Sequence, residues 1–303
     1  MKLEKYSIGV GDRFTHQGKA QLKAIMRANE KGLNICPVWN KSNREHSYVG
    51  TNPSDTRKEA DEAVKALNFK GQYFVDADHI NLNTVSKYVE TSDFFTLDVA
   101  SFIGKESSQK DIDAFVASCK KYMGQLYIPG IEKPLQITKE LLYEAASKFL
   151  AAMNQASEIY VYLKKEKGEN CFITEVSMDE IEFPQTPIEM LFILKMLVNK
   201  GVQVQTIAPK FTGRFNKGVD YVGDLDQFAK EFEEDVLVID FGVKEFGLPQ
   251  ELKLSVHSGS DKFSIYPIMA KVIKKHDKGL HLKTAGTTWL EEVIGLSMSG
   301  GEG

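Results

Sequence analysis

The sequence predicts a single TIM-type (β/α)8 barrel, an α/β fold, and two observations lead to this prediction. Eight short segments with the character of buried strands recur along the 303 residues, and amphipathic helix patterns lie between many of them. Most strand segments are continuous apolar runs, which are typical of parallel strands whose outer face is covered by helices. A doubly wound open sheet is the main alternative.

The strand segments are spread over the whole chain. In order, they are residues 7–13, 34–40, 72–79, 94–100, 171–178, 202–209, 252–259 and 280–286. Two further apolar runs, 159–163 and 236–241, are additional strand candidates. Neither extra run decides against a barrel, which needs eight strands joined by crossover helices.

Amphipathic patterns between the strands predict helices over residues 54–67, 109–122, 139–153 and 187–199. The fourth helix has the best-marked boundaries. Thr186 and Glu189 form a capping box, Pro187 occupies the first helical position, and Gly201 follows the last turn.

We expect the whole chain, residues 1–303, to form one catalytic domain. The region of roughly 103–168 holds two helix patterns and an extra apolar run, so it is interpreted as an insertion. The segment 295–303 is rich in glycine and serine and has no packing signal, so it is expected to be a flexible tail.

The composition excludes several classes of partner. A net charge of -4 and a pI near 5.9 favour neither nucleic acid nor an anionic membrane as a partner. No apolar run approaches the roughly 20 residues that span a bilayer, and the start M-K-L-E-K-Y lacks a signal-peptide apolar region. Three cysteines that form no C-x-x-C pair are expected to be reduced. We therefore expect a cytoplasmic protein.

Polar residues gather at the carboxyl ends of the predicted strands, where the loops of such a barrel build an active site. This set is Asp12, Arg13, Asn40, Lys41, Arg44, Asp76, Asp78, His79, Asp98, Glu175, Asp179, Glu180, Lys210, Arg214, His257, Ser258, Ser260, Asp261, Lys262, Lys283 and Thr284. Their convergence indicates a site more strongly than any single motif does.

Three of the six histidines, His79, His257 and His281, lie within or at the end of apolar strand segments. Neutral imidazoles bind Zn, Ni, Mn or Fe, although a core histidine bonded to a neighbour is the alternative for each. Acidic and Gly/Ser-rich surroundings favour the ligand interpretation for His79 and His257. His281 stays open, because a side chain inside a strand could point away from the pocket.

Other strand-end residues suit a sugar acid. Glu175 interrupts an apolar run, so it is a stronger candidate acid or base than Asp179, for which a solvated loop position is at least as good an interpretation. The loop S-G-S-D-K after His257 combines small residues and a cation that suit a carboxylate or phosphate.

Five segments together resemble the tagaturonate/fructuronate epimerase family. They are D-A-D-H (76–79), E-V-S-M-D-E (175–180), A-P-K-F-T-G-R-F-N-K-G-V-D-Y-V-G-D (208–224), S-V-H-S-G-S-D-K-F-S-I-Y-P (255–267) and K-T-A-G-T (283–287). The resemblance covers nearly the whole chain, and its S-V-H-S-G-S-D-K-F stretch is highly specific. This chain is shorter than the family members and differs from them in its early segment, so the reaction type follows from the resemblance more directly than the substrate.

The resemblance implies a cytosolic epimerase that uses a divalent metal, here Zn, Ni or Mn, to interconvert two keto-uronates. It implies a proton acceptor at Asp78, metal ligands at His79 and His257, and a proton donor at Glu175 or Glu180. We choose His281 as the third ligand. The expected substrate-binding residues are Arg13, Lys41, Lys210, Ser258, Ser260, Asp261, Lys262 and Lys283. A small sugar acid is the expected partner, and a homo-oligomer is left open.

The inverted carbon of such keto-uronates is not next to the ketone, so we expect retro-aldol cleavage and re-addition. A metal-dependent aldolase that releases its fragments and a non-catalytic sugar-acid binding protein are the alternatives. One geometric question follows from strand alternation. Asp76 and Asp78 should share one face while His79 points to the other, unless the chain turns between them.

Overall fold

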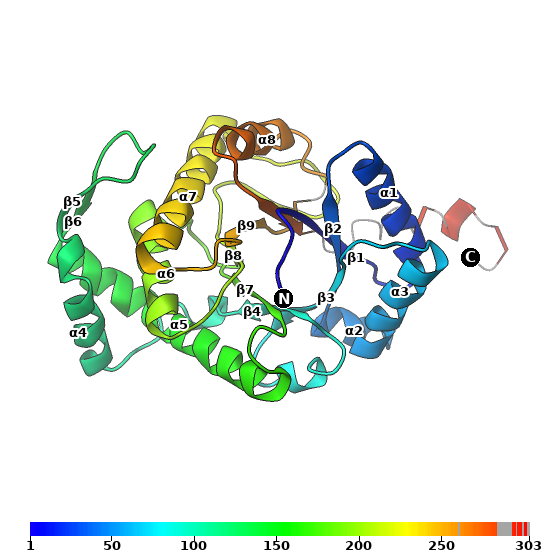
Figure 1. Ribbon diagram of the computed structural model, residues 1–303, viewed down its shortest axis with the longest axis horizontal. Coiled ribbons are helices and arrows are strands. Elements are labelled where there is room, and N and C mark those ends of the chain that lie inside the picture. The colour runs from blue at the N-terminus through cyan, green and yellow to red at the C-terminus, as the bar shows by residue number, and fades with distance from the viewer. Residues whose placement is uncertain (260, 284–292, 295, 299, 302–303) are drawn as a thin grey trace.

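The computed structural model describes residues 1–303 except 260, 284–292, 295, 299 and 302–303. Eight parallel strands close into a barrel, and helices surround it (Figure 1). Around the barrel the strands follow the order β1 (Tyr6–Gly11), β10 (Leu280–Lys283), β9 (Lys253–Val256), β8 (Thr206–Ala208), β7 (Ile173–Ser177), β4 (Phe94–Asp98), β3 (Phe74–Ile80) and β2 (Ile35–Ser42). Each of the eight predicted strand segments overlaps one of these strands, so the predicted TIM-type barrel is confirmed.

The α-helices are α1 (Gly18–Glu30), α2 (Asn43–Val49), α3 (Pro53–Ala66), α4 (Gln109–Ser118), α5 (Lys139–Lys167), α6 (Pro187–Asn199), α7 (Leu225–Phe246) and α8 (Tyr266–Lys275). Short 3-10 helices are η1 (Val85–Lys87), η2 (Ala100–Phe102) and η3 (Lys120–Tyr122). The boundaries predicted for α6 are confirmed, because the hydroxyl of Thr186 accepts from the Glu189 backbone amide and completes the capping box.

Two of the strand interpretations are wrong. Residues 159–163 lie inside α5, and residues 236–241 lie inside α7. Helix α7 packs against α6, α8 and β9 and buries the consecutive residues Asp235–Ile239, so this part of the helix is an apolar run without helical periodicity. A run of that kind does not distinguish a buried helix from a buried strand.

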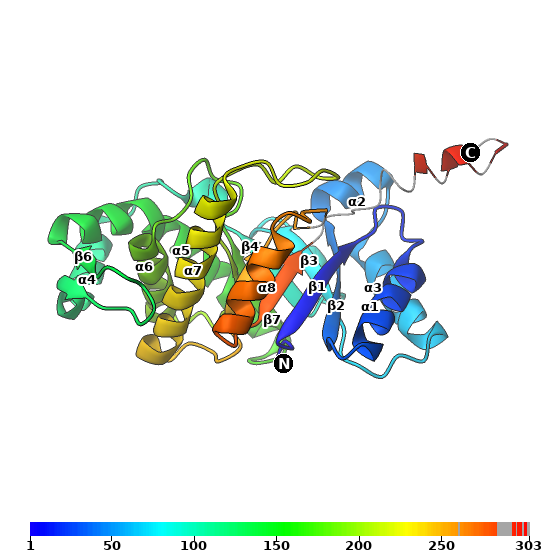
Figure 2. The ribbon, with the colours of Figure 1, turned by 90° about the horizontal axis from the view of Figure 1, so that it is seen from above.

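The segment between β4 and β7 is the region interpreted as an insertion. It contains α4, a two-stranded hairpin of β5 (Gly124–Leu126) and β6 (Leu135–Ile137), and α5. Helix α4 and the hairpin project at one end of the molecule (Figures 1 and 2). In the described part of the chain, no helix is both long and apolar enough to cross a membrane.

The interior of the barrel changes from apolar to charged toward the carboxyl ends of its strands. Leu3, Cys36, Val38, Phe74, Phe94 and Ile173 form a buried apolar cluster near the amino ends. Because side chains alternate along a strand, the next inward positions on three strands are Asp76, Thr96 and Glu175. All three are buried. This polar layer forms the floor of the candidate site.

Candidate active site

A pocket of about 280 Å³ opens at the carboxyl end of the barrel. Its lining comes from the ends of β2, β3, β4, β7, β9 and β10 and from the loop after β8. The lining residues are Ser42, Asn43, Arg44, Glu45, Asp78, His79, Asn81, Thr84, Asp98, Asp179, Glu180, Lys217, His257, Ser258 and Lys283. The predicted convergence of strand ends is therefore present in the fold.

The end of β3 turns so that two consecutive side chains reach this pocket. His79 has a φ of 52°, in the left-handed region, and the pairing of β3 with β4 shifts register between Ala77 and Ile80. Such an irregularity redirects a side chain to the other face of a strand. Asp78 and His79 both line the pocket, and Nδ1 of His79 lies 2.6 Å from Oδ1 of Asp78.

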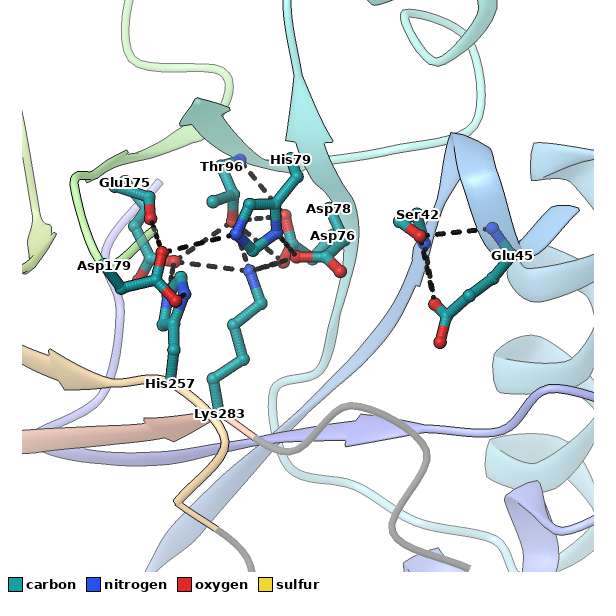
Figure 3. Close-up of polar contacts among 11 residues, drawn as sticks. Ser42, Glu45, Asp76, Asp78, His79, Thr96, Glu175, Asp179, His257 and Lys283 are labelled. Carbon is teal, nitrogen blue, oxygen red and sulfur yellow. Dashed lines mark hydrogen bonds and ion pairs between the residues drawn. The ribbon is translucent and has the colours of Figure 1, made fainter. Parts of the chain in front are cut away.

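Three residues from separate elements form a group that could hold a metal ion: His79, Asp179 and His257. Nε2 of His79 lies 3.5 Å from one carboxylate oxygen of Asp179, and Nδ1 of His257 lies 3.2 Å from the other. One ligand atom from each residue lies within 4.8 Å of the other two. Figure 3 shows the three side chains pointing toward one another.

The two histidines present suitable nitrogens. Nδ1 of His79 is bonded to Asp78, and Nε2 of His257 lies 2.8 Å from Oε1 of Glu175. The opposite nitrogen of each ring is buried and makes no hydrogen bond within the described residues. A carboxylate bonded to the far nitrogen of a histidine is the usual arrangement around a metal-binding imidazole, because it fixes the tautomer. The donor set therefore fits a divalent ion.

The charge of the group also favours a cation. Burial lowers the pKa of His257, but the carboxylates of Asp179 and Glu175 raise it more, to about 9. Burial raises the pKa of Asp179, but His257 and His79 hold it well below its usual range. The carboxylates therefore remain ionised and attract positive charge to this point, which a proton on His257 supplies in the absence of a metal and a divalent ion would replace.

Lys283 stands at the centre of the buried polar layer. Its Nζ lies 2.7 Å from Oδ2 of Asp76, 2.7 Å from Oδ1 of Asp78 and 3.3 Å from Oε1 of Glu175. It also donates to the hydroxyl of Thr96 (Figure 3). Burial lowers the pKa of Lys283, but the three carboxylates raise it well above its usual value. The ammonium is thus charged and fully engaged.

The neighbouring carboxylates respond differently to the same environment. Burial raises the pKa of Asp76 to about 7, because the attraction of Lys283 only partly offsets it. Burial also raises the pKa of Asp78, but the charges of His79 and Lys283 outweigh it and hold that pKa below its usual range. Burial raises the pKa of Glu175 as well, but Lys283 and His257 outweigh burial and hold that pKa well below its usual value. Asp78 is therefore an ionised carboxylate that faces the pocket.

The structure places His281 outside this group. Its Nδ1 lies 2.8 Å from the hydroxyl of Ser7, its ring packs against Phe94, and burial lowers its pKa to about 3. His281 and Lys283 are two residues apart on β10, so both point into the barrel, but His281 lies one layer deeper. In the described part of the chain, the group that could hold a metal ion includes Asp179 and not His281 as its third member.

Three of the cations predicted to bind substrate are occupied elsewhere. Nζ of Lys41 donates to the backbone oxygen of Arg13, and Nε of Arg13 lies 3.3 Å from Oε1 of Glu45. Nζ of Lys262 donates to the backbone oxygens of Asn216 and Val219. None of these three cations lines the pocket, and each ties one chain segment to another.

The remaining predicted residues divide between two adjoining pockets. Glu180 and Ser258 line the main pocket and also a neighbouring pocket of about 300 Å³. Lys210 lines only the neighbouring pocket, and Asp261 lines neither. Ser260 lies outside the described residues, as does Thr284.

Sequence reasoning missed Thr96 and undervalued Asp179. The hydroxyl of Thr96 contacts Asp76, Glu175 and Lys283. The available signal for Thr96 was a single polar residue within the apolar run F-F-T-L-D. Asp179 lies in a loop, and only the tertiary fold places its carboxylate between two histidines.

Comparison with known proteins supports one family. The family model for the tagaturonate epimerase UxaE matches residues 1–299. The chain belongs to the tagaturonate epimerase family. A tagaturonate/fructuronate epimerase of Thermotoga maritima is 31% identical over 305 residues, which cover 96% of this chain and 60% of that protein. The resemblance predicted from the five segments is thereby confirmed.

Solved structures of the tagaturonate epimerase family share the fold. A glycerol complex of the fructuronate-tagaturonate epimerase UxaE from Cohnella laeviribosi superposes with a TM-score of 0.80 at 25% identity, covering 97% of this chain and 59% of that one. The native form of that enzyme gives a TM-score of 0.76 at 24% identity, with the same coverage. The chain thus spans about three fifths of the length of these relatives. The YdjI aldolase from Escherichia coli, 9% identical with a TM-score of 0.53, shares the fold alone.

Proposed function

We propose that this chain is a metal-dependent epimerase that interconverts tagaturonate and fructuronate by retro-aldol cleavage and re-addition. Membership of the tagaturonate epimerase family and the names of its relatives support the substrate pair. One observation carries the mechanism: the turn at His79 brings a carboxylate base and a metal-ligating nitrogen to the same pocket. A protein that only binds a sugar acid has no need for this pairing.

The metal would be held by Nε2 of His79, Nδ1 of His257 and the carboxylate of Asp179. Asp179 takes the place that we had assigned to His281. Two nitrogens and a carboxylate suit Zn, Ni or Mn. A bound divalent ion supplies Lewis-acid stabilisation of negative charge on oxygen.

The reaction follows from where the two sugar acids differ. Their configuration differs at C4, which is separated from the C2 ketone by one carbon, so the ketone does not acidify the C4 hydrogen. When Asp78 takes the proton of the C4 hydroxyl, the C3–C4 bond breaks and its electron pair passes toward the ketone, which leaves an enediolate. C4 becomes the aldehyde of a fragment that carries the carboxylate. After this aldehyde turns over, C3 adds to its other face, the partner acid gives its proton to the new C4 alkoxide, and the proton held by Asp78 passes back to restore that acid.

We assign each step of this reaction to residues of the chain. Oδ1 of Asp78 contacts His79 and Lys283, so Oδ2 is the atom that we assign as the base. Lys283 keeps Asp78 ionised and fixes its direction. Glu180 is the proposed partner acid because it is exposed and lines the pocket. Glu175 is buried and bonded to His257, so its proposed role is to orient that ring.

Product analysis tests this function. Purified protein loaded with Mn, Ni or Zn is incubated with tagaturonate, and the products are resolved by NMR. Conversion to fructuronate, lost after metal removal that elemental analysis verifies, is the expected result. Accumulated three-carbon products would identify an aldolase, binding without turnover would identify a binding protein, and full activity without metal would refute the mechanism.

A further inference from the structure

The substrate of the proposed reaction carries a carboxylate that needs a cationic partner. Lys210, Lys262 and Lys283 are the lysines expected to supply it, but the ammonium groups of Lys262 and Lys283 are already engaged, and Lys210 lines only the adjoining pocket. Besides His79 and His257, whose rings are engaged by neighbouring carboxylates, five acidic and three basic side chains line the main pocket. The substrate carboxylate is therefore favoured beside a pocket cation that has no acidic partner.

Two cations of the pocket remain unpaired. Arg44 and Lys217 line the pocket and are exposed, and neither makes an ion pair with any described residue. Arg44 follows β2 and Lys217 lies in the loop after β8. These strands lie on opposite sides of the barrel, so the segments that carry the two cations leave opposite walls of the barrel.

The surroundings of Arg44 explain why its charge is available. Its neighbour Glu45 accepts from the backbone amide and the hydroxyl of Ser42, at 3.1 and 3.2 Å. Glu45 is also paired with Arg13. These contacts fix the first turn of α2 and occupy the carboxylate of the neighbouring residue, so among the described residues the Arg44 guanidinium has no acidic partner. Figure 3 shows Ser42 and Glu45 beside the strand end that carries Asp78.

Arg44 also lies close in the fold to the proposed base. Ser42 pairs in register with Asp78 across β2 and β3, and Arg44 follows two residues later. The substrate carboxyl carbon is two bonds from C4, whose hydroxyl must reach Asp78. Lys210 and Arg214 line the adjoining pocket, which does not include Asp78. Arg44 is therefore the better placed cation for the carboxylate.

We propose that Arg44 binds the carboxylate of the sugar acid, that Lys217 assists from the opposite wall, and that the Arg13–Glu45 pair positions Arg44. This inference rests on the proposed function. Arg44 also anchors the fragment that carries the carboxylate while the aldehyde of that fragment turns over. The fragment therefore re-adds instead of leaving. A planar guanidinium suits this task because it can hold a carboxylate through two parallel hydrogen bonds.

The test compares ligands with and without the carboxylate. Isothermal titration measures the affinity of an equilibrated tagaturonate/fructuronate mixture, which gives no heat of turnover, and of tagatose, which has a hydroxymethyl group instead. The proteins are wild type, Arg44→Met, Lys217→Met and Arg214→Met. Arg27→Met is the matched control, because Arg27 is an exposed arginine on α1 that lines neither pocket. Circular dichroism and metal content confirm that each variant is folded and loaded.

Wild type should bind the sugar acids about 10-fold to 100-fold more tightly than tagatose, as expected for charge-assisted hydrogen bonds. Arg44→Met should abolish this preference while leaving tagatose affinity unchanged, and Lys217→Met should reduce it. Arg27→Met should match wild type. The proposal is overturned if Arg44→Met keeps the preference, or if only Arg214→Met removes it.

Product analysis of the same variants separates this proposal from the proposed function. Arg44→Met should release three-carbon fragments that wild type retains. A wild type that binds but does not epimerise would refute the function, while an Arg44-dependent preference for the carboxylate would still support this subsite. A wild type that epimerises with an unchanged preference in Arg44→Met would refute the subsite alone.

Discussion

Asp78 and His79 are consecutive in the chain, yet both side chains face one pocket, with Nδ1 of His79 2.6 Å from Oδ1 of Asp78. The left-handed backbone at His79 makes this possible. A non-glycine residue in that region costs about 1–2 kcal/mol, which the surrounding contacts must offset. The left-handed turn at His79 therefore lowers local stability and places the proposed base directly beside a proposed ligand.

Replacing Asp78 with asparagine should separate its two roles. The amide oxygen of Asp78→Asn can still accept from Nδ1 of His79, so metal content should stay near that of wild type. Loss of the base should lower kcat by about 100-fold or more. The matched control is Asp76→Asn, one layer deeper and outside the pocket lining, which should cost much less activity. Equal losses in both variants would contradict the assignment of Asp78 as the base.

Metal binding should distinguish Asp179 from His281. Asp179→Ala, like His79→Ala and His257→Ala, should reduce the metal content of the purified protein severely. His281→Asn should retain it, because His281 bonds to Ser7 below the polar layer. Inductively coupled plasma mass spectrometry after dialysis provides the measurement. Metal loss in His281→Asn with retention in Asp179→Ala would restore His281 as the third ligand.

Removing the buried ammonium of Lys283 should destabilise the fold. Lys283→Met leaves buried carboxylates without their counterion, and breaking such a network typically costs about 3–5 kcal/mol of unfolding free energy. Urea titration at pH 7 measures it. The double variant Lys283→Met with Asp76→Asn should recover part of the loss, since it removes one of the unbalanced charges. An unchanged urea midpoint in the single variant would contradict this account.

A second buried pair predicts a dependence of stability on pH. Burial and the neighbouring Asp12 raise the pKa of Glu59 from its ordinary value of 4.5 to about 9. Between these two values the folded chain holds one more proton than the unfolded chain, so this group lowers stability as pH rises through that window. Glu59→Gln does not titrate but can still bond to Asp12 and to the backbone amide of Gly18.

The Tm of Glu59→Gln minus that of wild type should therefore increase as the pH rises from 5 to 8, by at least ~2 °C. Differential scanning calorimetry at several pH values measures the difference. The control is Glu62→Gln on the same helix, because Glu62 is exposed and its change should be independent of pH. A constant difference between Glu59→Gln and wild type would contradict the raised pKa of Glu59.

Much of the barrel could be predicted because its strands differ locally from its loops. Parallel strands covered by helices are apolar throughout, and such runs are visible without any tertiary information. The same logic failed for residues 236–241, because α7 buries consecutive positions there, and for residues 159–163, an apolar run of α5 that includes the exposed Val161. An apolar run does not report backbone conformation.

The eight strands, the family, and the polar residues that gather at the carboxyl ends of those strands could be predicted from the sequence alone. Which of these groups lie together follows from the folded chain. The choice of Asp179 over His281 depends on a loop conformation and on depth within the barrel. The occupied state of Lys283 and, among the described residues, the lack of an acidic partner for Arg44 depend on contacts between distant parts of the chain. Such contacts are non-local, so no short stretch of sequence encodes them.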